Sequence, residues 1–463
     1  MNFRRTGPTG RVDGISALLL LMAFALAGWK ISNQSPAAGF APMSQQGVSP
    51  ASASSGTIKS SSAASLPPQQ LSPDGRFLFD ANFVSAAPGQ AVHAASMVEL
   101  NDGRLRAVWF SGSREGARDV SIRSAVLDAA TLRWGEEAAI FDRQRIQQGL
   151  WRYVKKLGNP VIARAPDGSL VLWMVNVSLG GWAGSAITWA RSMDEGTTWS
   201  EPRRLVTSPF LNISTLVKGA PIAYQDGQMG LPVYHEFVTK FAEVLRINTQ
   251  GQVVDKIRIP GSRGSLQPVV LVADPERAQV YMRSGKSKVL MASATEDGGK
   301  TWVSSHGTTW PNPDSALAGV VSRTGAQWLA INPTPKDRET LALLQSGAGG
   351  TFDGVQPWIV ESSPTPEAHL SPGDYERLLG KELMAHGASE TQAKAYVASA
   401  IRQLCSADNC RQEFSYPYLL QSRDGYIHLV YTWHRTRIKH VRFDPLQPVP
   451  AAPAALNHAP ALD

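Results

Sequence analysis

Apolar and polar residues alternate in short stretches along most of the chain, and these stretches come in pairs separated by a tight turn. Because successive side chains of a β-strand point to opposite faces, each pair predicts an antiparallel hairpin with a buried face. Asp-Gly, which favours such turns, occurs in several of them, as at Asp102-Gly103. Six pairs begin at Val92, Asn159, Ala220, Gln267, Asn312 and Tyr416.

Apart from one interruption, the hairpins recur at intervals of about 40 to 70 residues over a chain of 463 residues. A repeat of this length made of strands favours a closed ring of sheets, in which each blade buries its faces against its neighbours. A β-sandwich is the competing architecture, and the number of similar hairpins makes it the weaker one. The pattern predicts an all-β fold, a six-bladed β-propeller.

Two nearly identical motifs support this prediction. RSMDEGTTW spans Arg191 to Trp199, and TEDGGKTW spans Thr295 to Trp302. Both predict a hairpin turn in which Asp accepts backbone N–H groups, Gly adopts a positive φ and Trp packs against neighbouring strands. They follow the second and fourth hairpins, and a degenerate copy spans Ser124 to Trp134. We expect a structural role for all of them.

A helical pattern interrupts the repeat before the last hairpin, over about residues 371–405. Ser371-Pro372 starts one helix and Gly387 ends it, and Ser389 with Gln392 forms a capping box for a second. This small helical insertion is either a lid beside a substrate cleft or a clip that packs on the ring. Cys405 and Cys410 follow it, and in an exported protein they predict a local disulfide.

The amino-terminal segment differs from the rest. In residues 1–31, basic residues precede the apolar run from Ile15 to Trp29, which predicts export through a signal anchor or a cleaved signal peptide. Residues 32–70 are rich in Ser, Ala, Pro and Gln and predict a flexible tether. The propeller is expected over 71–445, followed by a Pro/Ala-rich tail over 446–463. We expect a monomer, anchored to a membrane and facing the periplasm or the extracellular side, or else secreted.

The chain carries a formal net charge of +7, but its basic residues are dispersed and form no nucleic-acid-binding motif. It has no Walker loop, no HExxH, no GxSxG and no dinucleotide fingerprint. Its Asp and His residues have no regular metal-ligand spacing. We therefore expect no cofactor, no metal site and no nucleic-acid partner.

In a propeller, the ends of the inner strands and the adjoining loops converge on one central cleft, so polar residues at these positions are candidates for chemistry. They come from every predicted blade: His93, Arg114, Glu115, Asp119, Asn159, His235, Glu236, Lys240, Glu243, Gln267, Arg283, Asn312, Asp314, Tyr416 and Tyr418.

The two motifs resemble the Asp-box, or BNR repeat, and the stretch from about Val92 to Phe443 resembles the BNR repeat-like branch of the sialidase superfamily. The phrases REGARD, YHEF, SLQP, YMRS and PNPDS and the last hairpin carry this resemblance. It implies a sialidase-like propeller that binds a sugar carboxylate with three arginines. It also implies attack by a Tyr that a Glu activates, with an Asp protonating the leaving group.

By this resemblance Tyr416 is the nucleophile, Asp119 the acid/base and Arg283 one anion-binding arginine. Two positions depart from the pattern, because His93 stands where an Arg is expected and Ser265 where a Glu is expected. Arg114 is a second candidate cation, and Glu236 or Glu243 a substitute activator. The remaining predicted substrate-binding residues are His93, His235, Lys240, Gln267 and Asn312.

Each assignment has a purely structural alternative. Arg114 with Glu115 or Asp119 could steady a loop, Tyr416 and Tyr418 could pack the last blade, and His235 could pair with a neighbouring Glu. The alternation of His434, Arg435, Arg437, Lys439 and His440 favours one solvated strand face.

The leading functional hypothesis is a retaining exo-glycosidase that acts on terminal, including acidic, sugars of extracytoplasmic glycans. Tyr416, Asp119 and Glu236 are its predicted catalytic residues, and His93 and His235 are expected to titrate near neutral pH. The alternatives are a glycan-binding propeller without catalysis and a polysaccharide lyase that uses Tyr and His on uronates.

Overall fold

The computed structural model describes residues 14–32, 38–41, 70–71, 77–78, 80–128, 130–208, 212–347, 350–363 and 369–446. The chain divides into two compact units, Met1–Ala38 and Gly39–Asp463. The first contains helix α1 (Gly14–Ser32). Within the described residues, no helix combines the length and the apolar character needed to cross a membrane. Most of the predicted tether and the predicted tail lie outside the described residues, so the domain boundaries stay predictions.

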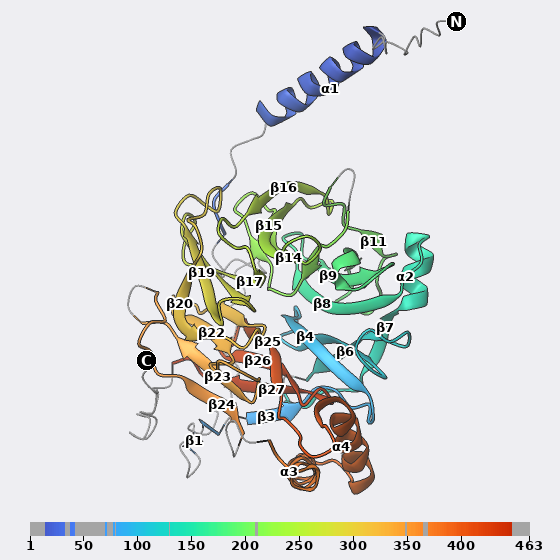
Figure 1. The fold of residues 1–463 in the computed structure, drawn as a ribbon, viewed down its shortest axis with the longest axis vertical. Coiled ribbons are helices and arrows are strands. Elements are labelled where there is room, and N and C mark those ends of the chain that lie inside the picture. Colours follow the sequence, from blue (N-terminus) through green and yellow to red (C-terminus); the bar gives the residue numbers. More distant parts are fainter. Residues whose placement is uncertain are drawn as a thin grey trace, which may run out of the picture. The chain divides into compact units, whose positions relative to one another are not determined.

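The second unit is built from six antiparallel sheets arranged around a central axis (Figure 1). In most sheets the strands follow one another in chain order from the inside outward. The first three sheets contain β4 (Ala91–Glu99), β5 (Leu105–Gly112), β6 (Ser121–Leu127) and β7 (Ala138–Asp142); β8 (Lys156–Arg164), β9 (Leu170–Val177), β10 (Ser185–Ser192) and β11 (Arg203–Arg204); and β12 (Leu216–Val217), β13 (Ile222–Ala223), β14 (Met229–His235), β15 (Phe241–Ile247) and β16 (Val253–Arg258).

The other three sheets contain β17 (Ser265–Val272), β18 (Ala278–Ser284), β19 (Val289–Thr295) and β20 (His306–Pro311); β21 (Ala318–Val321), β22 (Gln327–Ile331), β23 (Thr340–Gln345) and β24 (Trp358–Ser362); and β25 (Phe414–Gln421), β26 (Ile427–Trp433), β27 (Arg437–Phe443) and β3 (Asp80–Phe83). A small ladder pairs β1 (Gln70–Leu71) with β2 (Phe77–Leu78). Short helices α2 (Arg143–Leu150) and η2 (Trp182–Gly184) lie in connections. The prediction of a six-bladed propeller is confirmed.

The sixth blade closes the ring, because its outer strand comes from the start of the propeller. Strand β3 pairs with β27, with Phe83 opposite Lys439 and Asp80 opposite Arg442. In the described residues, apolar side chains form six clusters, one between each pair of neighbouring blades. The core is therefore distributed around the ring, as expected when no blade can bury both faces alone.

Both complete Asp-box motifs occupy the predicted outer hairpins, between β10 and β11 and between β19 and β20. The Asp194 carboxylate accepts the Thr198 backbone N–H at 2.8 Å, and Asp297 accepts that of Thr301 at 2.9 Å. Trp199 and Trp302 are almost completely buried. Their predicted role as structural turns agrees with these contacts.

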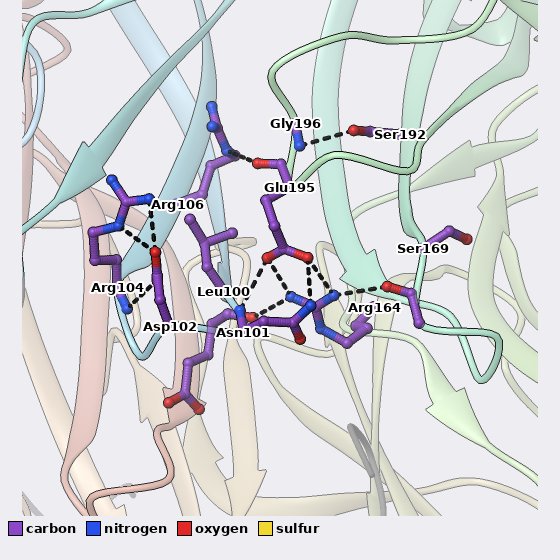
Figure 2. A network of polar contacts seen from close by, with 12 residues as sticks. Leu100, Asn101, Asp102, Arg104, Arg106, Arg164, Ser169, Ser192, Glu195 and Gly196 are labelled. Atoms are coloured by element: carbon purple, nitrogen blue, oxygen red, sulfur yellow. Dashed lines mark hydrogen bonds and ion pairs between the residues drawn. The ribbon is translucent and has the colours of Figure 1, made fainter. Parts of the chain in front are cut away.

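The first Asp-box turn also joins two blades (Figure 2). The Glu195 carboxylate accepts two hydrogen bonds from the Arg164 guanidinium, at 2.9 and 2.7 Å, and two from Asn101 of the β4–β5 turn, at 3.0 and 2.9 Å. Arg106 of β5 donates to the Glu195 carbonyl at 3.0 Å. The bidentate pair of Arg164 and Glu195 lies within the second blade and orients the carboxylate. The hydrogen bonds from Asn101 and Arg106 then connect this turn to the first blade.

The helical insertion consists of α3 (Pro372–Ala385) and α4 (Glu390–Leu404), and Cys405 and Cys410 form a disulfide. The predicted cap at Ser371 and capping box at Ser389 are both present. Apolar side chains of both helices, including Tyr375 and Tyr396, are buried in the cluster between the fifth and sixth blades. The insertion therefore packs on the ring, which supports the clip alternative.

Two expectations about burial are wrong. Phe40 lies within the predicted tether, yet it is fully buried between the third and fourth blades and stacks on Tyr224 at 5.4 Å. The side chains from His434 to His440 do not form a solvated face, since His434, Arg437, Lys439 and His440 are buried. The reason is that β27 is covered by β3 and the insertion, which the alternation of the sequence does not reveal.

Candidate functional site

The inner strands of several blades carry a break in their ladder at the same level. Tyr416 of β25, Gln267 of β17 and Asn159 of β8 have left-handed φ values of 53°, 52° and 42°, and each is followed by proline. The pairing register shifts at these positions. A left-handed non-glycine residue costs about 1 to 3 kcal/mol, and such breaks re-aim a side chain. The strained positions provide the residues that meet at the axis.

Gln267 connects these blades. Arg283 Nη1 lies 2.9 Å from Gln267 Oε1, while Gln267 Nε2 lies 3.3 Å from the Tyr234 hydroxyl and 3.4 Å from that of Tyr416. A guanidinium only donates hydrogen bonds, so the amide oxygen must face Arg283 and the amide nitrogen must face the two phenols. Gln267 therefore donates to Tyr416 and cannot take up its proton.

Three arginines surround Tyr416. Arg283 interacts electrostatically with the phenol and pairs with Asp314 at 2.8 Å. The Arg338 guanidinium lies 5.9 Å from the centre of the Tyr416 ring, and Arg435 also interacts electrostatically with the phenol. Sequence reasoning identified only Arg283 of these three, because Arg338 lies in a loop of the neighbouring fifth blade and Arg435 in the β26–β27 turn, which strand pairing brings beside Tyr416.

Glu413 orients two of these arginines. Its carboxylate lies 2.9 Å from Arg435 Nε and 3.4 Å from Arg338 Nη1, and it accepts a hydrogen bond from Ser415 at 2.7 Å. Burial would raise the pKa of Glu413, but Arg435 and Arg338 outweigh it and lower this pKa to about 2. The carboxylate stays ionised and holds both guanidinium groups in place.

His93 packs directly on the candidate nucleophile, with its ring centre 4.1 Å from that of Tyr416. Burial lowers the pKa of His93 well below 6.5, and the charges of Arg435 and Arg338 act in the same direction. The expectation that His93 titrates near neutral pH is therefore wrong. Its Nδ1 is buried, and among the described residues it has no hydrogen-bond partner. A neutral ring stands where the family pattern has a cation.

Lys218 is buried beside Tyr416 and was not singled out from the sequence. Its Nζ donates to the Pro417 carbonyl at 2.8 Å and lies 5.9 Å from the Tyr416 ring centre. Burial lowers the pKa of Lys218 to about 7. A single lysine inside the apolar phrase LVKGAPIA was the available signal.

Two carboxyl groups face the arginines from other blades. Burial raises the pKa of Glu236, which interacts electrostatically with Lys240, Arg283 and Glu115. Glu115, in the β5–β6 loop, lies 3.4 Å from Arg435 Nη1. Glu236 and the exposed Lys240 were predicted site residues, whereas Glu115 was one of the candidates for chemistry but was given no role. Because the pKa of Glu236 is raised, this carboxyl group is suited to carry a proton.

The structure does not bring the remaining predicted residues into this cluster. Asp119 is exposed and accepts hydrogen bonds from the backbone N–H and hydroxyl of Ser113, at 2.9 and 3.0 Å. Arg114 is also exposed. His235 pairs with Glu243 at 2.8 Å, and Asn312 uses both amide atoms on the backbone of Ser315. In the described part of the chain, no group of three or more His, Cys, Asp or Glu side chains could hold a metal ion.

The sequence profile of the BNR repeat-like domain family matches residues 103–429, which is most of the chain. The protein belongs to this family. The solved structure of Hadza microbial sialidase Hz136 aligns with a TM-score of 0.55 and 16% identity, covering 77% of this chain and 66% of that one. A Dyadobacter fermentans protein of unknown function aligns with a TM-score of 0.56 and 11% identity, covering 78% and 97%.

The intramolecular trans-sialidase of Ruminococcus gnavus, in complex with oseltamivir carboxylate, aligns with a TM-score of 0.54 and 12% identity, covering 79% of this chain and 96% of that one. At these identities the structural similarity establishes a sialidase-like fold. Just under two thirds of the Hadza enzyme is covered. No curated protein sequence matches the chain.

Proposed function

We propose that this BNR repeat-like protein is a retaining glycoside hydrolase that removes a terminal sugar bearing a carboxylate. The observation that carries the proposal is the arrangement of Arg283, Arg338 and Arg435 around the Tyr416 phenol. Guanidinium groups bind carboxylates through paired, charge-assisted hydrogen bonds. The sialidases among its structural neighbours support this substrate class.

Tyr416 is the proposed nucleophile. A neutral phenol can approach an anomeric carbon that bears a carboxylate, whereas a carboxylate nucleophile would meet charge repulsion. In the first step the Tyr416 oxygen forms a bond to this carbon while the bond to the leaving oxygen breaks. In the second step water replaces Tyr416. Two inversions at the same carbon retain its configuration.

Glu236 and Glu115 are the proposed proton carriers. Burial raises the pKa of Glu236, and this carboxyl group protonates the leaving oxygen. The phenolic proton of Tyr416 passes to Glu115, the carboxylate beside Arg435. In the second step the attacking water gives a proton to Glu236, and Tyr416 recovers its proton from Glu115. This assignment replaces Asp119, whose carboxylate is occupied by Ser113.

The second candidate function is glycan binding without catalysis. Gln267 favours it, because the side chain on the Tyr416 hydroxyl is an amide that cannot act as a base. The arginines and the neutral His93 would then bind an acidic sugar without cleaving it. A lyase would use the same residues on a uronate and would release an unsaturated product that absorbs ultraviolet light.

The test uses a fluorogenic α-glycoside of N-acetylneuraminic acid, with the corresponding galactoside as a neutral control. We expect cleavage of the acidic glycoside only. NMR should show that the sugar is first released with its original anomeric configuration. Tyr416→Phe should lower kcat by about 100-fold or more, and Arg338→Lys should raise KM by about tenfold or more. Binding without cleavage would support the second candidate, and neither binding nor cleavage would reject the proposed substrate class.

We also propose that the protein is exported, as its amino-terminal sequence predicts. The Cys405–Cys410 disulfide supports this, because such bonds persist in oxidising compartments. Fractionation of cells with intact and opened envelopes, followed by thiol labelling, should find the protein outside the cytoplasm with both cysteines protected. A cytoplasmic, fully reduced protein would contradict the proposal.

A further inference from the structure

Tyr234 is a second phenol at the candidate site, and the sequence did not single it out. It lies near the end of β14 in the third blade and is only 2% exposed. Its hydroxyl shares the Gln267 amide with Tyr416 and interacts electrostatically with Tyr416, Glu236 and Arg283. The two phenols therefore face the same group of charges from different blades.

The hydroxyl oxygen of Tyr234 accepts two hydrogen bonds. Asn159 Nδ2 lies 3.2 Å from it and Gln267 Nε2 lies 3.3 Å from it. A phenolic oxygen has limited acceptor capacity, and two donors occupy it. The remaining hydrogen-bonding capacity of Tyr234 is its own proton, which must point away from both amides.

No described residue accepts this proton through a hydrogen bond. Other buried tyrosines of the chain give theirs to the protein: Tyr431 donates to Glu361 at 2.6 Å, Tyr396 to the Ala86 carbonyl at 2.6 Å and Tyr281 to Gln279 at 2.9 Å. Burial, and then the proximity of Tyr416, raises the pKa of Tyr234, so its hydroxyl stays protonated. Tyr234 is thus a fixed donor with an unused hydrogen.

We propose that Tyr234 donates a hydrogen bond to an oxygen of the sugar bound against Tyr416. The inference rests on the proposed function, because it requires an acidic sugar at this site. Carboxylate and hydroxyl oxygens both fit a neutral donor placed among arginines. Arg283 contributes indirectly, since it sets the orientation of the Gln267 amide and thereby the direction of the Tyr234 hydroxyl.

The first test is Tyr234→Phe, which removes one oxygen atom. Tyr281→Phe is the matched control, because it removes a buried phenolic oxygen that bonds Gln279 instead. With the N-acetylneuraminic acid glycoside as probe, Tyr234→Phe should lower kcat/KM by about 10- to 100-fold, the range of a hydrogen bond to a charged group. The control should keep wild-type kcat/KM, and melting temperatures report whether both variants fold.

The second test is Asn159→Asp, which places an acceptor where the structure has a donor. The new carboxylate should take the Tyr234 proton and lower kcat/KM although the hydroxyl is still present. In a double-mutant cycle, Asn159→Asp should have much less effect when Phe already replaces Tyr234. An equal effect in both backgrounds would mean that the added charge is responsible, and it would overturn the inference.

The outcomes separate the two proposals. If the wild-type protein cleaves or binds the probe and Tyr234→Phe does so within twofold of the wild-type kcat/KM or affinity, the role of Tyr234 is overturned. The proposed function is then left intact. A wild-type protein that neither binds nor cleaves the probe rejects the proposed function and this inference with it. Loss of kcat/KM in Tyr234→Phe, together with the coupling to Asn159, supports both.

Discussion

The two residues that depart from the sialidase pattern both leave a polar atom without a partner. His93 Nδ1 and Ser265 Oγ are buried, and neither has a hydrogen-bond partner among the described residues. An orphaned buried polar atom costs about 1 to 3 kcal/mol unless a ligand or water satisfies it. Both atoms belong to inner strands, β4 and β17, which also carry the residues around Tyr416.

Glu236→Gln should separate the proposed acid from Asp119. We expect kcat to fall by about 100-fold, because the amide cannot protonate a leaving oxygen. In the wild-type protein, activity that depends on protonated Glu236 should be present at low pH and fall as pH rises through its raised pKa. The variant should lose this limb of the pH–kcat profile.

Asp119→Asn is the matched control for that experiment, and its kcat should stay within about threefold of wild type, since the carboxylate bonds only Ser113 in the described structure. A large effect at Asp119 with none at Glu236 would reverse the assignment.

At the scale of elements, the helical insertion supports the turn that carries Arg435. Tyr375 of α3 bonds His434 Nδ1 at 2.8 Å, and Gln403 of α4 donates to the Arg435 carbonyl at 3.2 Å. His434 and Arg435 both have left-handed φ values, 48° and 53°. Such a strained turn persists only when its surroundings fix it. The insertion thereby positions an arginine of the site without touching the phenol.

Tyr375→Phe should therefore weaken binding of the acidic probe. The ring of the buried His434 would lose its only described hydrogen bond, and the Arg435 turn would gain freedom. We expect a KM increase of about three- to tenfold with little change in kcat, since one neutral hydrogen bond contributes about 1 kcal/mol. The Tyr281→Phe variant, which also loses a buried phenolic hydroxyl, should keep the wild-type KM. This comparison separates positioning from general destabilisation.

Phe40→Ala tests the unexpected docking of the predicted tether. Its ring is fully buried beside Tyr224, and its backbone N–H donates to the Pro275 carbonyl at 2.8 Å. Removing a buried phenyl ring costs about 3 to 5 kcal/mol, so the free energy of unfolding should fall by this amount in denaturant titration. An exposed replacement such as Phe237→Ala should change it little. An unchanged stability for Phe40→Ala would show that this contact is dispensable.

Local patterns predicted the hairpins, the Asp-box turns and the capped helices, because each depends on residues close together in the chain. Gln267 and Tyr416 were among the candidates because each begins a predicted hairpin, and both lie in the cluster described above. Arg338, Glu413 and Arg435 could not be found this way, since their proximity depends on strand pairing within the sixth blade and on the packing of the fifth blade against it. Phe40 was missed because the tether was predicted from the average composition of residues 32–70. A single aromatic residue hardly changes that composition.

At the scale of the molecule, buried histidines link stability to pH. Burial lowers the pKa values of His428 and His434 to about 3, and that of His440 well below 6.5. His428 and His440 stack with Nδ1 and Nε2 3.0 Å apart, so protonating both places two charges in the sixth blade. Below about pH 6.5 the unfolded chain binds protons that the folded chain does not.

The free energy of unfolding should therefore be highest above pH 6.5 and fall progressively as pH decreases towards 3. Melting temperatures measured across this range check the prediction. His428→Gln should flatten the pH dependence, whereas His306→Gln, at an exposed position, should leave it unchanged. A melting temperature that does not depend on pH would show that these histidines are protonated in the fold at little cost.

The pairing of β3 with β27 has a consequence for biosynthesis. The strand that completes the sixth blade leaves the ribosome before any other part of the ring, and its partner is made after all the other strands. The nascent protein must hold an unpaired edge until Phe443 has emerged, so the circle can be completed only after its last blade has been made.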